Sequence, residues 1–129
     1  MEDIRLPLSH DIPTSAARRA CEKALKDWDV PDRTDDVLLV TSELVQNVTQ
    51  HTDDGGELHL SLQDDTILIE VTDTSPEAPH VSAIDHTRSG GRGMLLIAAV
   101  TQRWGTRPAA WAGRKGKVVW ARLARRLSP

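Results

Sequence analysis

The chain has 129 residues, enough for one hydrophobic core, and we expect residues 1–129 to form a single domain. Sixteen Lys and Arg against nineteen Asp and Glu leave a net charge of −3, which argues against a general nucleic-acid-binding protein. No segment approaches the ~18 apolar residues of a transmembrane helix, and the N-terminus lacks the apolar core of a signal peptide. With a single cysteine and therefore no internal disulfide, we expect a cytoplasmic protein.

The first third of the chain predicts one strand and two helices. Residues 4–8 suit a short edge strand. Pro7 has no backbone N–H to donate, which argues against a central strand. Residues 14–28 form an amphipathic pattern with Cys21 in the apolar stripe, so we interpret this cysteine as a core residue. A second helix is predicted from Asp32 to about His51, with acidic residues in its first turn.

Two strands follow, at 57–63 and 66–73, and the short Asp64-Asp65 connection predicts an antiparallel hairpin. The second strand is almost continuously apolar, which indicates the more central position in the sheet. Residues 73–92 show no periodicity, and a loop of this length in a small domain is commonly a functional lid.

The remaining pattern predicts a short buried helix at 94–100 and two more strands at 103–107 and 116–124. The order of elements is therefore helix, helix, two strands, loop, helix and two strands. This order predicts an α/β two-layer sandwich, in which helices cover one face of a mixed, mostly antiparallel sheet.

Three polar residues recur at four-residue intervals on the second predicted helix: Glu43, Asn47 and His51. This spacing places them on one helical face, beside an apolar stripe that already serves the core. Glu43 has the chemistry to accept a proton, and the Asn47 amide oxygen suits Mg²⁺ when a nucleotide supplies most of the other ligands. The alternative is a simple solvated face of an amphipathic helix.

Asp73 follows the most apolar predicted strand. A carboxylate at the rim of a pocket can accept a hydrogen bond from an amino group such as the exocyclic amine of adenine. The alternative is a turn-initiating aspartate, which the sequence Asp-Thr-Ser-Pro also suits.

Glycines at 90, 91 and 93 run directly into the predicted helix at 94–100. Glycine allows close backbone approach, a helix N-terminus offers free N–H groups to an anion, and Arg92 adds a cation. The segment matches neither a P-loop nor a dinucleotide fingerprint, and a flexible hinge is the alternative interpretation.

Taken in order, Glu-x-x-x-Asn on a helix, an Asp ending a strand and a Gly-x-Gly opening a helix resemble the Bergerat ATP-binding fold. This fold is shared by sensor histidine kinases, gyrase-type topoisomerases, MutL-type repair proteins and anti-sigma serine kinases. The sequence is most similar to the small single-domain members, the anti-sigma-factor serine/threonine kinases and their actinobacterial relatives. The resemblance extends over nearly the whole chain.

The resemblance implies a role for each matching residue. Asn47 would coordinate the Mg²⁺ that bridges the ATP phosphates, and Glu43 would act as the general base that orients the attacking hydroxyl. Asp73 would receive the adenine amine.

The resemblance also assigns the glycine-rich segment. Gly91, Arg92 and Gly93 would close over the phosphates as a lid, and Met94 would begin the helix that supports it. His51 would have a structural or phosphate-side role rather than a metal-binding one.

Three positions depart from the family pattern. Val48 stands where a small Ala is common, and Gln50 where relatives often carry a basic residue. Val118 stands where a Thr is frequent near the phosphates, and whether the neighbouring Lys117 compensates is left open. These departures favour nucleotide binding over efficient turnover.

The leading hypothesis is an ATP- and Mg²⁺-dependent serine/threonine protein kinase that phosphorylates an anti-sigma antagonist and alternately sequesters a sigma factor. Because relatives often dimerise, a homodimer is a further expectation. The alternative is a regulatory binding module, nucleotide-dependent or nucleotide-free, that transfers no phosphate. A sensor histidine kinase is disfavoured, because the chain has no room for a phosphoacceptor domain and membrane spans.

Two further hypotheses come from other classes. A purely structural interaction protein predicts no nucleotide affinity. Nucleic-acid binding would use the basic residues near the C-terminal end, which we otherwise interpret as a solvated strand end and tail: Arg114, Lys115, Lys117, Arg122, Arg125 and Arg126.

Overall fold

The computed structural model is a two-layer α/β sandwich, and it describes residues 2–9, 14–51, 56–73, 100–111 and 114–126. Within these ranges, side chains are described except at 47–51, 73, 111, 114 and 115. The helices are α1 (Thr14–Asp27) and α2 (Thr34–His51). The strands are β1 (Glu2–Leu8), β2 (Gly56–Gln63), β3 (Thr66–Asp73), β4 (Arg103–Trp111) and β5 (Arg114–Ala124).

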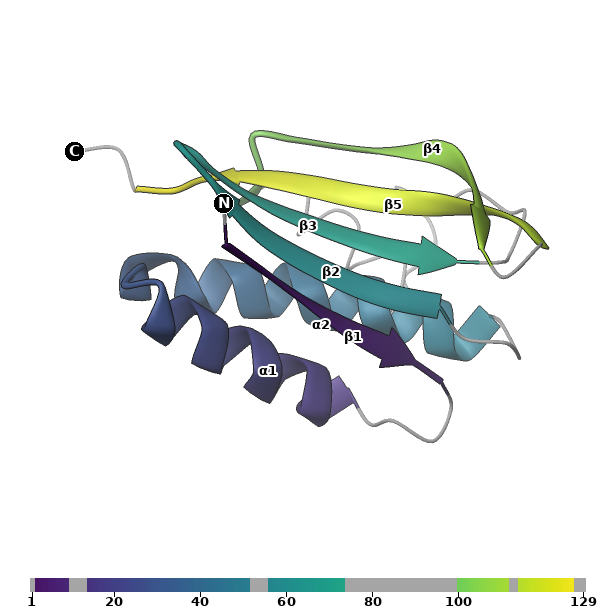
Figure 1. Cartoon of the computed structure of the whole chain (residues 1–129), viewed down its shortest axis with the longest axis horizontal. Coiled ribbons are helices and arrows are strands. Elements are labelled where there is room, and N and C mark those ends of the chain that lie inside the picture. The colour runs from purple at the N-terminus through teal and green to yellow at the C-terminus, as the bar shows by residue number, and fades with distance from the viewer. Residues whose placement is uncertain (1, 10–13, 52–55, 74–99, 112–113, 127–129) are drawn as a thin grey trace, which may run out of the picture.

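The five described strands form one sheet in the order β1-β2-β3-β5-β4, and each neighbouring pair is antiparallel. Both α1 and α2 lie against the same face of this sheet (Figure 1). The predicted fold class is therefore confirmed, including the hairpin of β2 and β3 and the central position of β3.

The connection between the two helices is a tight reversal that ends α1. Asp29 has φ of 60°, in the left-handed region, and its N–H donates to the Lys26 carbonyl at 3.1 Å. The Val30 N–H donates to the Leu25 carbonyl at 3.0 Å, and both of these side chains are buried. This pattern is a Schellman motif with its hydrophobic contact, and it explains why the helix stops before Pro31.

The second helix begins two residues later than its predicted start at Asp32. A 3₁₀ turn, η1 (Pro31–Arg33), precedes it, and the Thr34 N–H bonds to the Pro31 carbonyl. A proline suits the first position of such a turn because its missing N–H would be unpaired there anyway. The buried Arg33 forms an ion pair with Asp36 at 3.1 Å, which joins the turn to the first turn of α2.

The two edge strands each contain a proline, Pro7 in β1 and Pro108 in β4. Proline is tolerated at an edge because its missing N–H faces away from the neighbouring strand. Strand β4 extends four residues beyond the predicted end at Arg107, because its pairing with β5 continues to Trp111 opposite Arg114.

The core lies between the helices and the covered face of the sheet. Alternate residues of each strand point into it, and Leu60, Ile69 and Ala121 are fully buried on three neighbouring strands. The helices contribute their apolar stripes, including the fully buried Val40 of α2. The remaining helical members of the core are Ala17, Cys21, Ala24, Leu25, Val37, Leu44 and Val45.

Cys21 is a core residue, as predicted. Its side chain is fully buried, and its sulfur lies 3.8 Å from the Thr41 hydroxyl of α2. Burial raises the pKa of the thiol to about 11, and the hydrogen bond with Thr41 offsets this only in part. The thiol therefore stays protonated at neutral pH and packs as a small apolar group between the helices.

The predicted loop at 73–92 and helix at 94–100 fall almost entirely outside the described residues. Val100 is described as helical and packs partly buried against the core, in agreement with the predicted end of that helix. Of the helices that the structure describes, none is both long and apolar enough to cross a membrane.

Candidate functional site

Glu43 lies on α2 at the border between the buried stripe and the surface. It follows Val40 by three residues and precedes Leu44, and both of these neighbours are buried in the core. The Glu43 side chain is partly buried, and its Oε2 is enclosed without a hydrogen-bond partner among the described residues. Desolvation by this burial raises the pKa of the carboxyl above its ordinary value of 4.5.

Asn47 and His51 lie one and two helical turns after Glu43, within the same continuous helix α2. The helical repeat therefore puts the three residues on one face, as the sequence predicted. The side chains from 47 to 51, including Val48 and Gln50, lie outside the described atoms, so their roles stay predictions.

Asp73 is the last residue of β3, as predicted, and it pairs with Gly56 on one side and Lys117 on the other. Only four residues separate His51, at the end of α2, from Gly56. This short connection holds the C-terminal end of α2 close to the end of β3. Figure 1 shows both ends on the same side of the molecule, with the helix beneath the sheet.

The strand pattern also assigns Asp73 to a face of the sheet. Ile67, Ile69 and Val71 are fully buried on the covered face, and Asp73 continues this alternation by position. The predicted helix residues and the predicted strand-end carboxylate thus belong to the same side of the sheet and the same end of the molecule. The structure describes only the backbone of Asp73.

Strand β5 changes one interpretation made from the sequence. Val119, Ala121 and Leu123 face the core, so Lys117 shares their face and Val118 belongs to the opposite one. Val118 pairs with Thr72 and Arg107, away from the helices. The missing threonine hydroxyl at 118 therefore does not face the α2 side, where the phosphates were expected.

Lys117 also lies at this end of the sheet, and it was not assigned to the site from the sequence. It is 9% exposed and lies directly opposite Asp73 in the pairing of β3 and β5. The signal was present in the alternation of β5, where the apolar positions 119, 121 and 123 predict that 117 points the same way. Lys117 therefore adds a cationic side chain to the side of the sheet that carries Glu43.

The glycine-rich segment completes the predicted site, but Gly91, Arg92, Gly93 and Met94 lie outside the described residues. Two surface hollows of about 400 and 580 Å³ are lined by described residues at the opposite end of the sheet, around the turn at Asp64 and Asp65. Neither hollow includes Glu43. No group of three or more His, Cys, Asp or Glu side chains in the described part of the chain has the arrangement of a metal site.

The family model described as a histidine kinase-like ATPase domain matches residues 10–123, from just before α1 to one residue short of the end of β5. No curated protein matches this chain. The matched region contains every residue that the sequence proposed for the site.

Proposed function

Because the chain belongs to the histidine kinase-like ATPase domain family, we propose that it is an ATP-binding regulatory protein whose nucleotide site lies beside α2. The adenine would meet Asp73 at the end of β3, and the phosphates would lie toward Asn47 and the segment Gly91–Arg92–Gly93. Met94 and His51 would support that segment and the phosphate side of the pocket.

The observation that carries the proposal is the enclosed Oε2 of Glu43, which has no hydrogen-bond partner among the described residues. Burying a carboxylate oxygen without a hydrogen bond destabilises the folded state, so such a group indicates a functional role. Its raised pKa also makes the ionised carboxylate a better proton acceptor than an exposed glutamate. Both features suit a general base.

Asn47 is the proposed Mg²⁺ ligand, because its amide oxygen is a hard neutral donor one helical turn from Glu43. When bound, the ion would neutralise charge on the phosphates, and Mg²⁺ usually takes few protein ligands beside phosphate oxygens and water. The ligand proposed for this chain agrees with this preference, because a single amide from α2 is sufficient and no carboxylate cluster is required.

The finer proposal is a serine/threonine protein kinase that acts as an anti-sigma factor. Glu43 would accept the proton of a Ser or Thr hydroxyl on an antagonist protein as the hydroxyl oxygen attacks the γ-phosphorus and ADP leaves. The support is the resemblance of the Glu43, Asn47 and Asp73 pattern to the small kinases of this kind. The sigma factor, the antagonist, a homodimer and a cytoplasmic location all stay predictions.

Calorimetric titration of the full chain with Mg·ATP tests the nucleotide site. We expect wild-type binding and a loss of at least about tenfold in affinity for Asn47→Ala, since metal ligation carries much of the phosphate interaction. Gln63→Ala, an exposed amide at the far end of β2, is the matched control and should bind as the wild type does. Equal affinity of Asn47→Ala and wild type would refute the site.

Transfer of labelled phosphate to a Ser- or Thr-containing partner tests the kinase. Glu43→Gln should retain Mg·ATP binding while transfer falls by about 10²-fold or more, as expected when a general base is removed. Glu22→Gln, an exposed acid on α1, should leave transfer unchanged. Undiminished transfer by Glu43→Gln would exclude the proposed base.

The second candidate is a nucleotide-binding module that transfers no phosphate. It is favoured by Val48 and Gln50, which stand where the family pattern has a small Ala and often a basic residue. Binding of Mg·ATP with neither hydrolysis nor transfer by the wild type would select this module over the kinase.

A further inference from the structure

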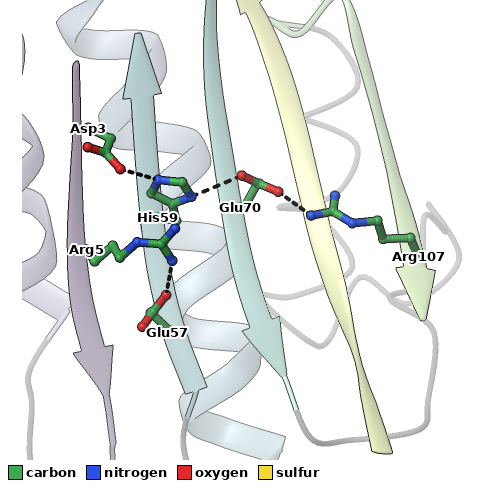
Figure 2. A network of polar contacts seen from close by, with 6 residues as sticks. All are labelled: Asp3, Arg5, Glu57, His59, Glu70 and Arg107. Atoms are coloured by element: carbon green, nitrogen blue, oxygen red, sulfur yellow. Dashed lines mark hydrogen bonds and ion pairs between the residues drawn. The ribbon is translucent and has the colours of Figure 1, made fainter. Parts of the chain in front are cut away.

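The sheet face that the helices leave uncovered divides into two regions of different charge balance. On β1, β2 and β3 the carboxylates are paired: Asp3 and Glu70 both contact His59, and Glu57 contacts Arg5. Figure 2 shows these side chains in a row across the strands, with Arg107 reaching over β5 to Glu70. The charged side chains of this region therefore contact partners within the protein itself.

The second region lies on β5 and β4 and carries unpaired positive charge. Arg103 and Arg122 lie directly opposite each other in the pairing of these strands, and both side chains are exposed. Neither guanidinium forms an ion pair with a carboxylate anywhere in the described part of the chain. Like charges placed directly across a strand pair destabilise a sheet, so this arrangement is unfavourable for folding alone.

An aromatic and an aliphatic side chain lie beside these arginines. A Cβ at Gly105 would come within 2.9 Å of Trp120 Cζ2, so the indole ring lies across the glycine of β4. The Arg122 guanidinium lies 5.8 Å from the centre of that ring. Leu68 of β3 pairs with Arg122 from the other side and is partly exposed, as is Trp120.

We name Leu68, Arg103, Trp120 and Arg122 the arginine face. It combines a partly exposed Trp and Leu with two exposed arginines that form no ion pair among the described residues, in a chain whose net charge is −3. Trp and Arg are the residues most enriched among those that dominate protein–protein binding energy. The local composition therefore indicates an anionic partner with apolar side chains, rather than solvent.

The charges around the arginine face decide between two kinds of anion. Glu70 borders it on β3, and the Asp64–Asp65 turn is hydrogen-bonded to Arg125, three residues after Arg122. A nucleic acid carries closely and evenly spaced phosphates, which would run onto these carboxylates. An acidic peptide can place its carboxylates on the two arginines alone and set apolar residues between them.

We propose that the arginine face docks an acidic, amphipathic segment of a partner protein. Carboxylates of that segment pair with Arg103 and Arg122, and an apolar side chain packs on Trp120 and Leu68. The surface lies on the opposite side of the sheet from α2, so the proposal is independent of the nucleotide site.

Fluorescence anisotropy of a labelled peptide of alternating Glu and Leu, titrated with the full chain, tests this surface. We expect saturable binding that weakens as salt rises and that falls by about tenfold or more in Arg103→Glu/Arg122→Glu, since two charge contacts become repulsive. The control is Arg18→Glu/Arg19→Glu, which makes the same charge change on exposed residues of α1 and should leave binding near wild type.

Three results would overturn the proposal. The first is equal binding of the peptide by both charge-reversed variants, and the second is no binding by the wild type. The third is tighter binding of a single-stranded oligonucleotide than of the peptide in a parallel titration, which would assign the surface to nucleic acid.

A thermal melt of Arg103→Glu separates docking from a structural role. This variant replaces a repulsive Arg–Arg pair with an attractive one, so it should melt at or above the wild-type temperature while its peptide binding falls. A lower melting temperature together with weaker binding would show that the arginine serves the fold, and the docking proposal would fail.

Discussion

The two faces of the sheet are built from the same strands but are stabilised in different ways. On the face toward α1 and α2, Leu60, Ile69 and Ala121 are fully buried in a continuous apolar core. On the open face, the residues immediately beside them are Ser61, which is buried, Leu68, which is partly exposed, and Arg122, which is exposed. Because successive side chains alternate between the two faces, one strand contributes both to the core and to a surface available for binding.

Polar groups are also used differently on the two faces. On the covered side, the partly buried Glu43 and the buried Lys117 lie at the border of the core, near the end of the sheet where the nucleotide is proposed. On the open side, charged side chains form a row of contacts across β1, β2 and β3, whereas Arg103 of β4 and Arg122 of β5 form no ion pair among the described residues. Glu43 Oε2 and the two arginines lie at the surfaces for which we propose ligands.

The largest expected difference between the faces is in adjacent residues of β3. Ile69→Ala should lower the free energy of unfolding by about 2–5 kcal/mol, because it leaves a cavity in the core. Leu68→Ala, one residue earlier on the open face, should cost less than about 1 kcal/mol. Urea unfolding followed by circular dichroism measures both, and equal losses would contradict the assignment of the faces.

A smaller effect is expected where β4 approaches Trp120 on the open face. Gly105→Ala should cost about 1–2 kcal/mol, because the new methyl group would displace the indole ring. The penalty should largely disappear in a Trp120→Leu background, where the ring is absent. Urea unfolding of the four proteins gives this double-mutant cycle, and an unchanged penalty would place its cause elsewhere.

The charge row in Figure 2 should contribute less than the core does. Glu70→Gln should destabilise the protein by about 1 kcal/mol, because the 14%-exposed carboxylate contacts both His59 and Arg107. Glu57→Gln breaks only the pair with Arg5, whose side chain is 59% exposed, and should cost less than about 0.5 kcal/mol. Chemical denaturation should preserve this ranking, and a reversed order would refute the bridging role of Glu70.

The smallest expected effect concerns the covered side and depends on pH. Since the pKa of Glu43 is raised in the folded state, its ionisation opposes folding, and stability is lost as the pH rises through the folded pKa. The stability of Glu43→Gln relative to wild type should therefore increase from about pH 3.5 to about pH 7. Denaturant midpoints across this range measure the difference, and a relative stability that falls with pH would reverse the sign.

Much of the fold was predictable, because the spacing of apolar residues along the sequence indicates where helices and strands form. The apolar spacing of 14–28 and the alternation of 57–63 and 66–73 predicted α1, β2 and β3 to within one residue at each end. The start of α2 and the end of β4 were less predictable. A 3₁₀ turn occupies the residues before Thr34 that were predicted to begin α2, and pairing with β5 extends β4 past Pro108.

The candidate site was predictable in part. The four-residue spacing placed Glu43 and Asn47 on one helical face, and the end of β3 at Asp73 agrees with the predicted boundary. The enclosure of Glu43 Oε2 and the position of Lys117 opposite Asp73 were not predictable, since both depend on how distant segments pack.

Periodicity in the sequence was sufficient to determine the helices, the hairpin and the α/β class, because side-chain direction repeats every 3.6 residues in a helix and every two in a strand. The strand order, which inserts β5 between β3 and β4, was decided only by tertiary pairing. That pairing turned Val118 away from α2, set Arg103 against Arg122 and brought Arg107 to Glu70, since contacts between strands depend on register and not on local sequence.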